Sequence, residues 1–180
     1  MFSKKTINDF DIAGKRVLLR TDYNVPLNKD GSVASAYRIE QSLPTIKALQ
    51  SKGCQIVICS HLGRPKSSAD TQFSLKPVAR ELSKLIKHDV TFVSDCVGDS
   101  VKYATDSMTE GDIVLLENVR FHEEEEKNDA EFAKSIIEST GAEVLVQDGF
   151  GVVHRAHTTT DAIARQIPAV AGLHLAREAD

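Results

Sequence analysis

Short apolar runs alternate along the chain with segments in which apolar residues recur at every third or fourth position. Five runs rich in Val, Ile and Leu predict strands at residues 16–21, 55–59, 90–93, 112–116 and 143–146. The runs are continuously apolar rather than alternately apolar and polar, which is typical of strands covered by helices on both faces. A parallel sheet is therefore expected.

Three of the intervening segments predict amphipathic helices. Residues 38–52 carry apolar side chains three and four positions apart and end at Gly53, a helix stop signal. Residues 75–88 repeat this spacing behind Ser74, which is the expected N-cap. Residues 129–140 show the same pattern and are also followed by a glycine.

Weaker helical patterns at residues 97–108 and 161–166 complete the alternation of strands and helices. This order predicts an α/β fold, a three-layer Rossmann-like doubly wound parallel sheet in a single domain, with right-handed crossovers. A length of 180 residues agrees with one domain, and neither a flexible linker nor an internal repeat interrupts the pattern.

Composition narrows the class of protein. Hydrophobic residues make up 41% of the chain and charged residues 27%, which excludes a disordered or fibrous protein. The longest apolar runs are four residues, too short to cross a membrane, and the N-terminus lacks the apolar stretch of a secretory signal. A cytoplasmic location is expected, where Cys54, Cys59 and Cys96 would be reduced thiols.

The net charge of −4 argues against nucleic acid as a partner, because nucleic-acid-binding domains usually carry a basic excess. The charge is unevenly placed, since residues 123–131 hold six acidic residues and one lysine. We interpret this acidic run as a solvated loop face. Basic side chains elsewhere can still gather in a pocket.

The residues that follow the strands are unusually polar. In an open α/β sheet a ligand lies beyond the carboxyl ends of the strands, so these residues are the candidates for chemistry. They are Asp22 and Asn24 after the first strand, His61, Gly63 and Arg64 after the second, Glu117, Asn118 and Arg120 after the fourth, and Asp148, His154, Arg155 and His157 after the fifth.

Three of these positions, together with one at the start of a helix, point to an anion. Arg64, Arg120 and Arg155 lie on the loops, and Arg38 opens the first helix. Arginine presents a planar fork that matches phosphate or carboxylate, and several arginines brought together repel one another unless an anion joins them. The expected ligand is small, multiply anionic and hydroxylated, with Asp22 as one of the groups that contact its hydroxyls.

Two other patterns are weaker. His154 and His157, with His61, could form a metal site, but no cysteine or third ligand completes a known zinc spacing, and His154 is expected to pack instead. Gly149 and Gly151 begin a G-x-G-x-x-G pattern that lacks its third glycine, so a dinucleotide site is not expected.

Five motifs together resemble the N-terminal, phosphoglycerate-binding domain of the phosphoglycerate kinase family. They are R-T-D-Y-N-V-P, R-I-E-Q-S-L-P-T-I, S-H-L-G-R-P, L-L-E-N-V-R-F and F-G-V-V-H-R-A-H. They occur in the family's order and spacing, and the resemblance covers nearly the whole chain from about Lys15.

The resemblance implies a glycolytic transferase that moves a phosphoryl group between 1,3-bisphosphoglycerate and ADP, giving 3-phosphoglycerate and ATP. It implies a monomer of two domains, in which residues 1–172 form the N-terminal domain and 173–180 begin the interdomain helix. Mg-ATP or Mg-ADP would be bound by the nucleotide-binding C-terminal domain, which this chain lacks, so no cofactor or metal is expected here. The chain alone is expected to be inactive.

The resemblance also assigns roles by position. Arg38 corresponds to the catalytic arginine, and Arg120 and Arg155 to clamps on the phosphate that is not transferred. The whole set implied to contact the substrate is Asp22, Tyr23, Asn24, Arg38, His61, Leu62, Gly63, Arg64, Arg120 and Arg155. The alternative is a free-standing α/β module that binds an anion without catalysis.

Overall fold

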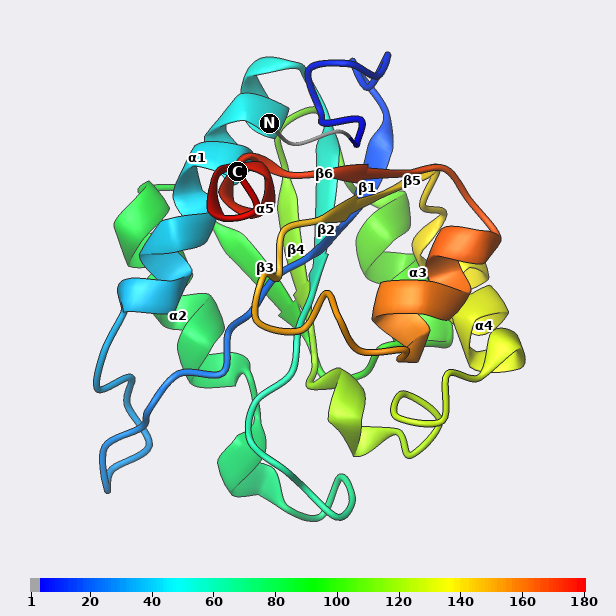
Figure 1. Ribbon diagram of the computed structural model, residues 1–180. Coiled ribbons are helices and arrows are strands. Elements are labelled where there is room, and N and C mark those ends of the chain that lie inside the picture. The colour runs from blue at the N-terminus through cyan, green and yellow to red at the C-terminus, as the bar shows by residue number, and fades with distance from the viewer. Residues whose placement is uncertain (1–3) are drawn as a thin grey trace.

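Six parallel strands form the centre of the computed structural model, which describes residues 4–180 (Figure 1). Their order in the sheet is β3-β4-β2-β1-β5-β6. The strands are β1 (Arg16–Arg20), β2 (Gln55–Cys59), β3 (Val90–Val93), β4 (Ile113–Leu116), β5 (Val144–Gln147) and β6 (Ala169–Ala171). Because all six are parallel, their carboxyl ends lie at one edge, and the loops that follow them meet there.

Helices cover both faces of the sheet, as the α/β pattern predicts (Figure 1). The α-helices are α1 (Tyr37–Ser51), α2 (Lys76–Ile86), α3 (Asp99–Asp106), α4 (Ala130–Thr140) and α5 (Leu173–Glu178). Helices α1 and α2 pack on one face, with α5 against α1, and α3 and α4 pack on the other.

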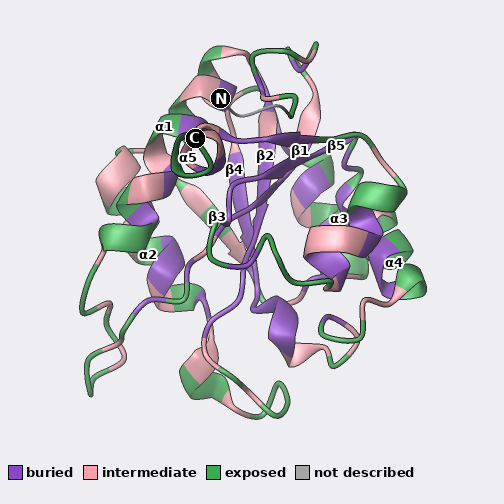
Figure 2. Cartoon of the chain, viewed as in Figure 1, coloured by how far each residue is buried: buried purple, intermediate pink, exposed green. Residues whose placement is uncertain are grey.

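Side chains of each central strand alternate between two cores. In β1, Val17 and Leu19 join the core under α1 and α2, whereas Leu18 joins the core under α3 and α4. All three are fully buried, and Figure 2 shows the same burial along the other central strands. Strands with two covered faces need apolar residues at every position, which explains the continuous apolar runs.

Three elements differ from the sequence expectations. β6 was not predicted because its run is only three residues, and it is held by pairing with β5. β3 lies at the sheet edge and is only partly buried, unlike the expected fully covered strand. The expected helix at 161–166 is instead a π-helical turn, Thr158–Ala162, followed by a 3-10 turn, Ile163–Arg165.

Glu117, directly after β4, fixes the edge of the sheet that carries the polar loops. Its carboxylate accepts hydrogen bonds from the Ser74 hydroxyl at 2.6 Å and from the Leu75 and Asn118 amides at 2.8 Å. Leu75 is the residue before α2, and the helix begins at Lys76, one residue later than predicted. One buried carboxylate thus joins the end of a strand to the start of a helix.

Within residues 4–180, none of the helices combines the length and the apolar character that crossing a membrane would require.

Gly141, which caps α4, should be intolerant of a side chain. Its φ is +67°, and an added Cβ would lie 2.7 Å from Nη1 of Arg16, which donates to the Thr140 carbonyl. We expect Gly141→Ala to destabilise the fold by about 2–3 kcal/mol, from left-handed backbone strain plus the displaced hydrogen bond. Urea unfolding measures the loss.

Gly14 provides the matched control, because its φ is +71° and an added Cβ would meet nothing within 4 Å. Gly14→Ala should cost about 1–2 kcal/mol, the backbone strain alone. Equal losses in the two variants would show that the Arg16 contact contributes nothing.

Candidate anion-binding site

His61, two residues after β2, lies at the centre of the polar loops. Its side chain is 3% exposed, and its Nδ1 is 3.2 Å from Nη2 of Arg20. Burial, and then the charges of Arg20, Arg120, Arg155 and Arg38, lower the pKa of His61 to about 2. The imidazole is therefore neutral at physiological pH, with four guanidinium groups close enough to act on it.

Arg20 is part of this group, although sequence reasoning missed it. It ends β1 and is only 1% exposed. Its Nε donates to the Thr159 hydroxyl at 2.8 Å, and its Nη1 donates to the Thr21 carbonyl. The available signal was its position: an arginine at the end of a strand covered on both faces must find buried partners.

Glu125 supplies buried negative charge to the same region. It lies in the acidic run, and its side chain is fully buried, so the interpretation of that run as a solvated face is wrong at this position. Its carboxylate accepts hydrogen bonds from the amide and the hydroxyl of Thr159. Burial raises the pKa of Glu125, and the charge of Arg20 opposes this rise. The remainder of the run, such as Glu123, is more exposed.

Arg120 lies in the short 3-10 helix Val119–Phe121 that follows β4. Its Nη1 donates to the Gly63 carbonyl at 3.0 Å, and its Nε is 3.5 Å from the Glu126 carboxylate. Among the described residues, this buried Nε has no hydrogen-bond partner. Burial lowers the pKa of Arg120, Glu126 raises it, and Arg155 lowers it again. The guanidinium is thus positioned but incompletely paired.

Arg38, in the first turn of α1, is held by Asp22. Its Nη1 lies 2.9 Å from both carboxylate oxygens, and its side chain remains 49% exposed. Gly151 allows the loop after β5 to approach the same carboxylate, since a Cβ there would lie 2.5 Å from it. Asp22 therefore orients a guanidinium that is still half-exposed to solvent.

A pocket of about 220 Å³ lies beside the Arg38–Asp22 pair. Its wall includes the Thr21 hydroxyl and the carboxylate of Asp148, both nearly fully buried. Oγ1 of Thr21 and Oδ2 of Asp148 have no hydrogen-bond partner within residues 4–180. Burial raises the pKa of Asp148, which otherwise accepts a hydrogen bond from the Leu175 amide of α5.

The loops after β1 and β2 are joined by Asn24. Its side-chain oxygen accepts a hydrogen bond from the Gly63 amide at 2.8 Å. Since the Gly63 carbonyl accepts from Arg120, this backbone segment connects Asn24 to the loop after β4. Asn24 and Gly63 also line a second pocket, of about 340 Å³.

Two expected substrate contacts have side chains that face the core instead. Tyr23 is fully buried, and its hydroxyl lies 2.7 Å from that of Ser42, which satisfies the polar group. Leu62 is 2% exposed and packs in the core under α1 and α2. Both residues are almost completely buried, backbone included, so neither is exposed at this edge of the sheet.

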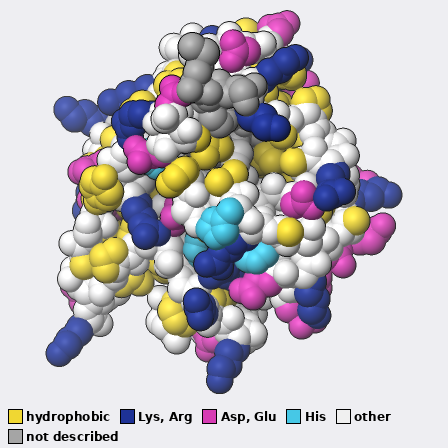
Figure 3. Space-filling model, viewed as in Figure 1, with side chains coloured by type: hydrophobic (Ala, Val, Ile, Leu, Met, Phe, Trp, Pro, Cys, Tyr) yellow, Lys and Arg dark blue, Asp and Glu magenta, His cyan; other side chains and the backbone are white. Residues whose placement is uncertain are grey.

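The arginines predicted to converge do so in part. Arg38, Arg120 and Arg155 all act on His61, and Arg155 is exposed. Arg64 is also exposed, but it is not among the cations that shift the pKa of His61. Figure 3 shows histidine side chains beside basic ones on this face, with acidic side chains next to them.

His154 does not pack as expected, since it is exposed on the loop after β5. The neighbouring His157 is half-buried, and burial and the charge of Arg120 lower its pKa. In the part of the chain that the structure describes, the histidines of this loop are not gathered with a third metal ligand.

Known proteins resemble the chain over nearly its whole length. A family model described as phosphoglycerate kinase matches residues 7–180. Phosphoglycerate kinases of Desulforudis audaxviator and Pelotomaculum thermopropionicum are 51% and 48% identical to it. Each of these alignments covers 98% of this chain but 44% of the relative, so the chain spans less than half the length of either.

Solved structures agree with these sequence comparisons. The crystal structure of phosphoglycerate kinase from Pyrococcus horikoshii OT3 matches with a TM-score of 0.86 at 30% identity, over 97% of this chain and 44% of that one. The structure of phosphoglycerate kinase from Coxiella burnetii matches with a TM-score of 0.85 at 34% identity, over 97% and 43%.

The neutral state of His61 should make the fold sensitive to acid. An unfolded histidine binds a proton below about pH 6.5, whereas His61 in the fold does not until about pH 2. Its contribution to stability is therefore present above pH 6.5 and lost as the pH falls. Between pH 7 and pH 5 the low pKa of His61 should reduce the free energy of unfolding by about 2 kcal/mol. His61→Asn should remove this part of the pH dependence.

Urea unfolding of both proteins at the two pH values measures this effect. Glu125 and Asp148, whose pKa values are raised, act in the opposite direction, but both proteins contain them. His154→Asn, at an exposed position, is the control and should follow the wild-type pH dependence. An unchanged pH dependence in His61→Asn would show that His61 has the same pKa in the folded and unfolded states.

Proposed function

This chain belongs to the phosphoglycerate kinase family, and we propose that it forms the half of such an enzyme that holds 3-phosphoglycerate. The reaction is the reversible transfer of a phosphoryl group between 1,3-bisphosphoglycerate and ADP, giving 3-phosphoglycerate and ATP. One observation carries the proposal. Arg38, Arg120 and Arg155 come from three different segments and all act on the same neutral imidazole.

The charge balance of the site favours a ligand with several negative charges. Arg38 is held by one carboxylate, and Arg120 is 3.5 Å from another, that of exposed Glu126. A phosphate and a carboxylate on one small molecule would add negative charge where guanidinium groups repel one another. Guanidinium groups bind both anions through two-point contacts, which orients the ligand as well as attracting it.

We assign the remaining contacts by the same logic. Arg120 and Arg155 clamp the phosphate that is not transferred, and Asp22 and Asn24 orient the glycerate. His61, Gly63 and Arg64 contribute further contacts, while Tyr23 and Leu62 support the site from beneath, because both residues are almost completely buried.

Arg38 is the residue we assign to the reacting end. Phosphoryl transfer leaves little covalent chemistry to the protein, so positioning and stabilisation of developing charge supply most of the acceleration. The guanidinium of Arg38 suits this role because it is half-exposed and yet oriented by two contacts to Asp22. The arrangement holds a donor in place before the charge develops.

Turnover requires more than this chain. The relatives are more than twice as long, and we infer that their remaining part binds Mg-ATP or Mg-ADP. In that arrangement α5 leads from the domain of residues 1–172 toward the nucleotide-binding domain. The 180-residue chain would bind 3-phosphoglycerate without catalysing transfer, as a monomer in the cytoplasm.

Titration of the chain with 3-phosphoglycerate tests the site. We expect micromolar to millimolar affinity, roughly −8 to −4 kcal/mol, that weakens as salt is added. Arg155→Ala should weaken binding by about 10-fold or more, because a charge-assisted hydrogen bond is lost. Arg80→Ala, at an exposed position on α2, is the control and should bind normally. Calorimetry showing no heat at tens of millimolar ligand would refute the assignment.

The role of Arg38 is tested in a full-length enzyme that contains this sequence. Arg38→Ala should lower kcat by at least about 100-fold, the scale expected for loss of one preorganised donor. Steady-state assays measure the effect, with Arg80→Ala again as control. Unchanged turnover would remove Arg38 from the mechanism, and 3-phosphoglycerate binding without any turnover in the full-length wild type would favour an anion-binding module.

A further inference from the structure

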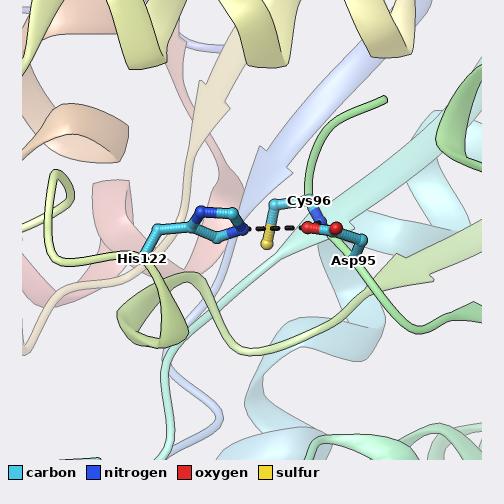
Figure 4. A group of neighbouring side chains, drawn as sticks. All are labelled: Asp95, Cys96 and His122. Atoms are coloured by element: carbon cyan, nitrogen blue, oxygen red, sulfur yellow. Dashed lines mark hydrogen bonds and ion pairs between the residues drawn. The ribbon is translucent and has the colours of Figure 1, made fainter. Parts of the chain in front are cut away.

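A second cluster of reactive side chains lies outside the anion-binding site, formed by Asp95, Cys96 and His122 (Figure 4). Asp95 and Cys96 follow β3, and His122 follows the 3-10 helix after β4. A carboxylate oxygen, a thiol sulfur and an imidazole nitrogen here lie within 4.8 Å of one another. We propose that these three side chains bind a divalent transition metal of the zinc type.

The distances suit such an ion after a small adjustment. Zinc takes ligands at about 2.0–2.3 Å, so two ligands of one tetrahedral ion lie about 3.3–3.8 Å apart. Nε2 of His122 and Oδ1 of Asp95 are now 2.8 Å apart, as hydrogen-bond partners. A metal would separate this pair slightly and draw the sulfur closer by about 1 Å, on the scale set by these bond lengths.

The mobility needed for this adjustment is available. The side chain of Asp95 is 46% exposed and that of His122 is 28% exposed, so both reach solvent, and the more exposed Asp95 can change rotamer. Cys96 is 1% exposed and forms the inner wall. Three protein ligands with a solvent-facing side leave a fourth position for water, the arrangement of an open zinc site.

The chemistry of the three ligands selects the class of metal. Sulfur, nitrogen and oxygen together suit zinc and its neighbours, whereas magnesium and calcium prefer oxygen alone. When the S–metal bond forms, the thiol proton leaves to solvent, and its hydrogen bond to the Glu117 carbonyl, now 2.9 Å, is broken. The proton that Nε2 of His122 shares with Asp95 also leaves, to solvent or to Nδ1 of the same ring, which frees the Nε2 lone pair for the metal. The thiolate and the carboxylate then carry two negative charges, which balance a dication beside the buried sulfur.

Groups around the cluster hold the ligands in place. The ring of His122 packs against that of Phe132, with the centroids 4.8 Å apart, which limits rotation of the imidazole. Oδ1 of Asp95 accepts a hydrogen bond from the Cys96 amide at 2.6 Å. Supporting contacts of this kind orient metal ligands and raise affinity.

Cobalt serves as the probe, because cobalt bound to a thiolate shows a charge-transfer absorption band in the near ultraviolet. Titrating the reduced 180-residue chain with Co²⁺ should produce this band with one equivalent per chain, and Zn²⁺ should abolish it by displacement. Cys96→Ser should lose the band. His122→Ala should bind Co²⁺ more than about 100-fold more weakly, since even supporting contacts contribute about 10–100-fold.

Cys54→Ser is the matched control, because the Cys54 thiol is also buried and also donates to a backbone carbonyl, that of Ile12. It should keep the band and the affinity. If Cys96→Ser does not fold, Asp95→Asn tests the site instead. It should fold, because its side-chain oxygen can still accept a hydrogen bond from the Cys96 amide, and it should bind Co²⁺ more weakly. Absence of the band in the wild type, or unchanged cobalt affinity in both His122→Ala and Asp95→Asn, would overturn the proposal.

Discussion

The burial of Arg20 is the constraint on which the functional edge of the sheet depends. A guanidinium that is 1% exposed has lost its hydration, which costs several kcal/mol unless polar groups replace the water. Those groups come from distant segments: the Thr159 hydroxyl, the imidazole of His61 and the nearby carboxylate of Glu125. Three loops are therefore fixed to the end of β1 by one charge. The solvent-facing part of the site is built on this buried layer.

This buried layer also sets the electrostatic character of the site. His61 stays neutral because burial and the surrounding arginines lower its pKa to about 2, so it adds no further positive charge. Asp22 holds Arg38 from one side only, which leaves the guanidinium both oriented and accessible. An anion that enters meets donors already in place, and binding then costs less conformational entropy. Preorganisation of the same donors is what a charge-stabilising mechanism requires.

The sequence predicted what depends on local pattern. The apolar run around Ile56 and Ile58 identified a doubly covered strand, and similar runs identified three others and the partly buried edge strand β3. The three-residue strand β6 carries no comparable signal, because pairing with β5 defines it. Glu125 shows the same limit at the site. Four adjacent glutamates are typical of an exposed loop, and only the distant Thr159 and Arg20 explain why one of them turns inward.

The loop after β4 connects the two regions of chemistry in the molecule. The Glu117 carbonyl accepts the Cys96 thiol, and its carboxylate holds the start of α2. The next residue, Asn118, donates to the Leu62 carbonyl, one position before the glycine that Arg120 contacts. The Asp95 carboxylate is charged before the ion binds, so a dication that displaces only the thiol proton makes the cluster more positive, and this charge acts on the arginines directly. Along the backbone, the change would begin at the Glu117 carbonyl, where metal binding breaks the thiol hydrogen bond.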